Sequence, residues 1–103
     1  MSAPSVRAVV TAAVADWAAH SPERSAFSVG CLRRHLAGDW GDLDHQDWAV
    51  NDRSVQLHSG RVLSNYRIPD QLRAADGDGQ LWIITDDLDD PDTATTLLFP
   101  RDY

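Results

Sequence analysis

The sequence predicts an α+β fold in which three N-terminal helices pack on one face of a C-terminal three-stranded antiparallel β-meander. In the first half of the chain, apolar residues recur every three or four positions, which is the period of an amphipathic helix. From Arg61 onward they recur at every second position, which is the period of a half-buried strand. The 103 residues suffice for one modest core, so residues 1–103 are expected to form a single domain.

The first helix is predicted over residues 4–20. Pro4 suits a first helical position, where no backbone N–H is needed. Ser21-Pro22 is expected to end this helix, because the residue before a proline avoids the α region. The residues that form its apolar stripe at helical spacing are Val6, Val9, Val10, Ala13, Val14 and Trp17.

Two further helices are predicted over residues 29–37 and 45–58. Ser28 is the expected N-cap of the second helix, and Gly38 is its expected C-terminal stop. Asp44 is the expected N-cap of the third, whose many polar interior residues place it at the surface.

Three strands are predicted over residues 61–68, 81–85 and 93–99. The first alternates, with Val62, Ser64, Tyr66 and Ile68 on one side, and the second is apolar throughout and therefore central. The Asp76–Gly79 segment carries strong turn signals, so it connects the first two strands.

The composition limits the partners of this chain. A net charge of −7 argues against direct nucleic-acid binding, which requires a positive surface. No apolar run is long enough to span a membrane, and no segment has the layout of a signal peptide. The single Cys31 suggests a cytoplasmic location; it is either a reactive thiolate beside basic residues or, as its helical setting favours, a small buried hydrophobe.

The segment from Gly38 to Trp48 holds the first candidate binding residues. Asp39, Trp40, Asp42 and His45 are left without a local duty once the helix cap and stop are assigned. Trp40 is either an exposed anchor for a protein partner or a side chain that fills the core between two helices. We expect an exposed tryptophan among carboxylates to bind basic residues.

The acidic loop at residues 86–92 is the second candidate. Its binding residues are predicted to be Asp86, Asp87, Asp89 and Asp90, which would meet a protein partner with a basic surface. Neither this loop nor the Gly38–Trp48 segment follows the ligand pattern of a calcium loop, and the four histidines lack zinc spacing. The sequence therefore predicts no metal site, no cofactor and no catalytic residue.

Two alternatives stay open beside protein binding. The Asp42, His45 and Asp47 cluster has the residue types of a small metal-dependent or acid/base enzyme. A structural accessory subunit is the other alternative. The helix-turn-helix appearance of residues 28–58 is not interpreted as DNA binding, because aspartates stand where phosphate contacts are needed.

Several segments together resemble a family of small bacterial proteins described as plasmid-related, carried on plasmids and integrative elements. The matching residues extend from about 32 to 103 and include Gly38–Leu43 (GDWGDL), Asp47-Trp48, Asn51-Asp52, Gly60–Tyr66, Leu81–Thr85 and Thr95–Tyr103. The resemblance implies a mobile-element context and no particular activity. We therefore expect a small acidic protein-binding domain of a mobile element, with inhibition of a host defence or nucleic-acid-handling protein by surface occlusion as its expected role and the oligomeric state left open.

Overall fold

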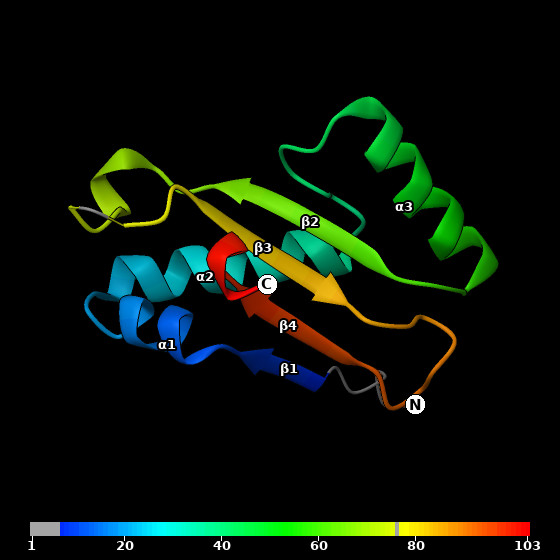
Figure 1. Ribbon diagram of the computed structural model, residues 1–103, viewed down its shortest axis with the longest axis horizontal. Coiled ribbons are helices and arrows are strands. Elements are labelled where there is room, and N and C mark those ends of the chain that lie inside the picture. The colour runs from blue at the N-terminus through cyan, green and yellow to red at the C-terminus, as the bar shows by residue number, and fades with distance from the viewer. Residues whose placement is uncertain (1–6, 76) are drawn as a thin grey trace.

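A four-stranded mixed sheet lies at the centre of the computed structural model, which describes residues 7–75 and 77–103 (Figure 1). In spatial order the strands are β1 (Arg7–Val10), β4 (Ala94–Leu98), β3 (Gln80–Thr85) and β2 (Val62–Arg67). β1 runs parallel to β4, whereas the β4–β3 and β3–β2 pairs are antiparallel. The predicted arrangement of three helices followed by a three-stranded meander is therefore wrong, because a strand precedes the helices and joins the sheet.

The helices lie between β1 and β2 in the chain. α1 (Ala12–Ala18) and α2 (Pro22–Leu36) cover one face of the sheet, and α3 (His45–Leu57) lies beside β2 (Figure 1). Two short 3-10 helices, η1 (Asp70–Leu72) and η2 (Pro100–Asp102), follow β2 and β4. No helix among the described residues is long and apolar enough to cross a membrane.

The core fills the space between the sheet and the first two helices. Val14, Trp17 and Cys31 from the helices pack against inward side chains of three strands, among them Tyr66, Ile83 and Leu97. Trp17 meets Phe27 and Phe99 edge to face, with ring centroids 6.4 and 5.9 Å apart. The alternation predicted for β2 is confirmed, since Val62, Ser64, Tyr66 and Ile68 are all buried.

The predicted first helix is wrong at its start. Arg7–Val10 form β1, whose residues pair with Ala94–Leu97 of β4, and Pro4 and Val6 lie outside the described residues. The β-branched pair Val9-Val10 suits an extended backbone as well as a helical stripe. Thr11 then caps α1, because its side chain accepts a hydrogen bond from the Val14 amide at 3.3 Å.

The predicted second helix begins too late. Ser21 caps α2 by accepting a hydrogen bond from the Arg24 amide at 3.1 Å, and Pro22 occupies the first turn. The Ser-Pro-Glu sequence is therefore a helix start, since a proline at the first position needs no donor. Ser28 is buried inside the helix, where its hydroxyl donates to the Arg24 carbonyl at 3.0 Å.

The third helix and the last three strands occupy the expected segments. Asp44 caps α3 through a 2.8 Å hydrogen bond from the Asp47 amide, as predicted. Among the residues of α3 only Asn51 is buried, which confirms that this helix lies at the surface. The left-handed conformation of His58, with φ of 49°, ends it.

Candidate functional site

The Gly38–Trp48 segment closes the outer edge of β2. The Asn65 amide donates to the Trp40 carbonyl at 3.2 Å, and the Asp42 amide donates to the Asn65 carbonyl at 2.6 Å. The Asp42 carboxylate accepts the Arg67 amide at 2.8 Å. These contacts satisfy edge groups that would otherwise be open to pairing with another strand.

Asn51 of α3 completes this edge. Its side-chain amide donates to the Leu63 carbonyl at 2.7 Å, and its carbonyl accepts the Leu63 amide at 3.4 Å. A single side chain therefore imitates the pairing of a neighbouring strand. The close approach of the segment to β2 requires Gly41, whose φ is +74° and whose site leaves no room for a Cβ beside the Asn65 carbonyl oxygen.

Trp40 is buried, with 2% of its surface exposed. Its indole N–H donates to the Asp52 carboxylate at 2.9 Å, and its ring meets the His35 ring edge to face with centroids 5.4 Å apart. Trp40 therefore fills the core between helices, and it is not available as an exposed anchor for a partner.

The other candidates in this segment have separate surroundings. Asp39 forms an ion pair with Arg34 at 2.8 Å, and this contact lowers the pKa of the Asp39 carboxyl. His45 is exposed at the first position of α3. Among the described residues no group of three histidine, cysteine, aspartate or glutamate side chains is placed to hold a metal ion, and this includes Asp42, His45 and Asp47.

The acidic loop between β3 and β4 is exposed and shaped by its own aspartates. The Asp87 carboxylate accepts the Asp89 amide at 3.0 Å, and the Asp90 carboxylate accepts the Asp92 amide at 2.8 Å. Asp86 is exposed as well. The Leu88 amide donates to the Gly60 carbonyl at 2.8 Å, which ties the loop to the start of β2.

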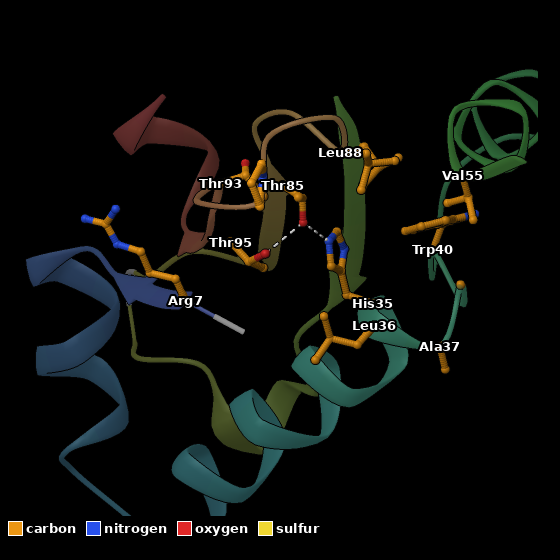
Figure 2. A pocket seen from close by; sticks show the side chains of 13 residues that line it. Arg7, His35, Leu36, Ala37, Trp40, Val55, Thr85, Leu88, Thr93 and Thr95 are labelled. Atoms are coloured by element: carbon orange, nitrogen blue, oxygen red, sulfur yellow. Dashed lines mark hydrogen bonds between the residues drawn. The ribbon is translucent and has the colours of Figure 1, made fainter. Parts of the chain in front are cut away.

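An open groove of about 370 Å³ lies beside this loop, between the C-terminal end of α2, the second half of α3 and the start of β4 (Figure 2). We call it the His35 groove. Its volume falls within the range of small-molecule and side-chain binding sites. The apolar side chains of its wall are Leu36, Ala37, Trp40, Val55, Val62, Leu88 and Pro91.

A chain of buried polar side chains forms the floor of the His35 groove. His35 Nε2 hydrogen-bonds to Thr85 Oγ1 at 2.8 Å, and Thr85 Oγ1 hydrogen-bonds to Thr95 Oγ1 at 2.8 Å (Figure 2). On the inner side, His35 Nδ1 hydrogen-bonds to the Ser64 hydroxyl. Both ring nitrogens are thus satisfied by hydroxyl groups, which can donate or accept.

Burial determines the charge of this floor. It lowers the pKa of His35 to about 4, so the imidazole is neutral near pH 7. A neutral ring donates from one nitrogen and accepts at the other, and hydroxyl partners fit both tautomers. The floor is therefore polar and uncharged.

Cys31 lies on the buried face of α2, and burial raises its pKa to about 12. It behaves as a small core side chain, as its helical setting favoured, and the alternative of a reactive thiolate is wrong.

Sequence reasoning missed the His35 groove. Ser28, Cys31 and His35 share one buried face of α2 at helical spacing, and this pattern marks His35 as inward-facing. Thr85 and Thr95 stand opposite each other in the β3–β4 register, which the sequence does not reveal. No protein-family model, no curated protein and no solved structure matches this chain.

Proposed function

We propose that this chain is a small acidic protein-binding domain that takes a basic, partly apolar segment of a partner at the His35 groove. The observation that carries the proposal is that an open apolar groove lies beside a loop with exposed aspartates, residues 86–92. Leu88 and Pro91 line the groove, and the aspartates alternate with them along the same loop. A partner that matches this surface needs apolar side chains flanked by arginine or lysine.

The electrostatic contribution follows from the charge of the chain. The chain has nine arginines and sixteen acidic residues, which gives the net charge of −7. An acidic surface of this kind accelerates encounter with a basic partner, and the effect weakens as salt rises. Each exposed ion pair contributes about 0.2–1 kcal/mol, so the apolar groove has to provide much of the affinity.

The mechanism is occlusion. A basic segment that is held at the groove cannot at the same time contact the phosphates of a nucleic acid. The resemblance to plasmid-related proteins leads us to propose a partner in host defence or nucleic-acid handling. Burial of Trp40 and the hydrogen bond of Asp42 to β2 support moving the binding surface from the Gly38–Trp48 segment to the groove and its loop.

The proposal is tested with a displayed library of random dodecapeptides, selected on the immobilised chain at 0.15 M salt. We expect selected peptides to combine arginine or lysine with leucine-like residues. Their affinity is then measured against a loop variant with amides at Asp86, Asp87, Asp89 and Asp90. Asparagine keeps the acceptor oxygens that shape the loop, so only the charge changes.

A matched variant carries the same change in charge at four exposed positions outside the groove and its loop, with amides at Asp16, Glu23, Asp47 and Asp70. The loop variant should weaken binding by about 2 kcal/mol, which is roughly thirtyfold, on the basis of four exposed pairs. The matched variant should stay close to the unmodified chain, because none of its changed residues lines the groove and salt screens charges that are not in direct contact with the partner. Equal weakening in both variants, or a selection without basic residues, contradicts the proposal.

A further inference from the structure

The two edges of the sheet differ. The outer edge of β2 is closed by the Gly38–Trp48 segment and by Asn51. At the opposite edge β1 is the outermost strand, and no described element lies on its outer side (Figure 1). All four residues of β1 are exposed. An open edge of this kind offers backbone donors and acceptors to another strand.

The backbone groups that face this open edge belong to Ala8 and Val10. The Thr11 amide donates to the Leu97 carbonyl of β4 at 3.1 Å, so Val9, two positions earlier, also directs its backbone groups toward β4. Ala8 and Val10 alternate with these residues and therefore direct their N–H and C=O groups outward. No described backbone group outside the β1–β4 pair hydrogen-bonds to either of them.

The edge of β1 lacks the features that usually prevent pairing between strands. Its register with β4 is continuous from Arg7 to Val10, so no bulge interrupts it. Residues 8–11 carry no charge and no proline. Arg7 is the only charged residue of the strand and occupies its first position. The middle of β1 is therefore suited to pairing with another strand.

We infer that β1 pairs antiparallel with β1 of a second copy of this chain, about a twofold axis beside Val9. Ala8 then stands opposite the partner's Val10, and Val10 stands opposite the partner's Ala8. Each of these pairs exchanges two backbone hydrogen bonds. Val9 stands opposite the partner's Val9 in a pair without hydrogen bonds, with Cα atoms about 4.5 Å apart. The two sheets become one continuous sheet, and the open edge is closed in both copies.

The side chains of this edge complement themselves in that register. On the helix-covered face Ala8 and Val10 line an open apolar groove of about 270 Å³, together with Val29 and Leu32 of α2. The register places the larger Val10 of each copy against the smaller Ala8 of the other. Val10 is 45% exposed and Val29 is 48% exposed, so both have apolar surface to bury. On the opposite face the two Val9 side chains meet as a β-branched pair.

Charge complementarity favours a second copy over an unrelated strand. In the same register Arg7 of each copy stands opposite Thr11 of the other. The Thr11 hydroxyl donates to the exposed Asp102 carboxylate at 2.9 Å. The exposed Arg7 side chain therefore meets an acidic group of the partner at each end of the paired strands. An extended peptide would supply the backbone groups but not this carboxylate, which comes from η2.

Self-association is measured by sedimentation velocity on the full chain, at loading concentrations from about 10 μM to about 1 mM, which cover weak specific association. We expect a reversible equilibrium between monomer and dimer without larger species, because an isologous contact closes the edge in both copies. Amide hydrogen exchange at Ala8 and Val10 should slow as the dimer fills, whereas exchange at Val9 should not change. A chain that stays monomeric throughout this range overturns the inference.

Opposite charges at position 9 test the register. Val9→Lys and Val9→Glu should each weaken self-association at least about tenfold, because two like charges about 5 Å apart repel. An equimolar mixture of the two variants should associate again, because the introduced charges are then opposite in sign. The control Val50→Lys, at a 60% exposed position of α3, should associate like the unmodified chain. Undiminished self-association of Val9→Lys, or a mixture that stays monomeric, overturns the inference.

Cysteine variants test the same register without a change in charge. The Cα separation expected at position 9 suits a disulfide, so mild oxidation should crosslink two copies of Val9→Cys. Ala8→Cys should crosslink far less, because the two introduced thiols then stand diagonally, with Cα atoms about 7–8 Å apart. The native Cys31 is buried in both variants. Equal crosslinking of the two variants, or a dimer that gives no crosslink in Val9→Cys, means that the copies meet at another surface and overturns the inference.

Discussion

Protonation of His35 should make the stability of this protein depend on pH between 7 and 5. The pKa of His35 falls from its ordinary 6.5 to about 4 in the folded chain because the ring is buried. Stability is therefore fully present above the unfolded pKa of 6.5 and is lost as the pH falls toward 4, since only the unfolded chain takes up the proton. This linkage removes about 2 kcal/mol between pH 7 and pH 5.

The measurement is urea unfolding at both pH values for the unmodified chain and for His35→Gln. Glutamine offers the hydroxyl groups hydrogen-bonding partners but does not titrate. The variant keeps His20, His45 and His58, so their contributions cancel in the comparison. We expect the unmodified chain to lose about 2 kcal/mol more than the variant on acidification.

Two results would refute this reasoning. The first is an equal loss of stability in both chains, within about 0.5 kcal/mol, the usual uncertainty of extrapolated free energies. The second is a direct NMR titration of the His35 ring with a midpoint near 6.5, its ordinary pKa. Either result means that the imidazole takes up a proton in the folded chain at little cost.

Three further substitutions concern the closed edge of β2, two of them as tests and one as a control. Gly41→Ala should destabilise the fold by about 3 kcal/mol or more in urea unfolding, because it adds a clash with the Asn65 carbonyl to the strain of a positive φ. Gly38 also has a positive φ but open space around it, so the control Gly38→Ala should cost about 1 kcal/mol. Asn51→Ala should lower the free energy of unfolding by about 1–3 kcal/mol and speed hydrogen exchange at the Leu63 amide, because the acceptor of that amide is removed. Unchanged exchange at Leu63 would contradict the role of α3 in covering the edge of β2.

Local signals predicted the elements whose causes are local. Asp44 and Asp47 give a cap that needs no tertiary contact, so the start of α3 was predicted correctly. The same holds for β2, where alternation identified the buried side. At Ser21-Pro22 the signal was equally local, but it was interpreted as a stop when it is a cap followed by a first-turn proline.

Nonlocal pairing explains the missing strand. The Arg7–Val10 segment is too short for its periodicity to indicate a strand, and its valines fit both a helical stripe and a strand. Its partner is β4, more than eighty residues away, and the two run parallel. The extended conformation of this segment becomes favourable only through its pairing in the sheet, so no local stretch of sequence predicts the strand.

The site could be predicted only in part for the same reason. The acidic loop was predicted because its aspartates are close together in the sequence, but the groove beside it joins side chains from α2, α3 and all four strands. Thr85 and Thr95 become neighbours through the register of the β3–β4 pair, and His35 reaches them from a helix on the covered face.

The proposed binding surface and the closed edge of β2 share Trp40. Its carbonyl holds the Asn65 amide, while its ring packs on His35 and lines the His35 groove. A change in the Gly38–Trp48 segment can therefore alter binding without any contact between that segment and a partner. A loss of binding in a Trp40 variant therefore has two explanations, a displaced groove wall or a lost contact with the partner. Val55 distinguishes them, because its side chain is exposed in the groove and can be changed without disturbing the buried Trp40.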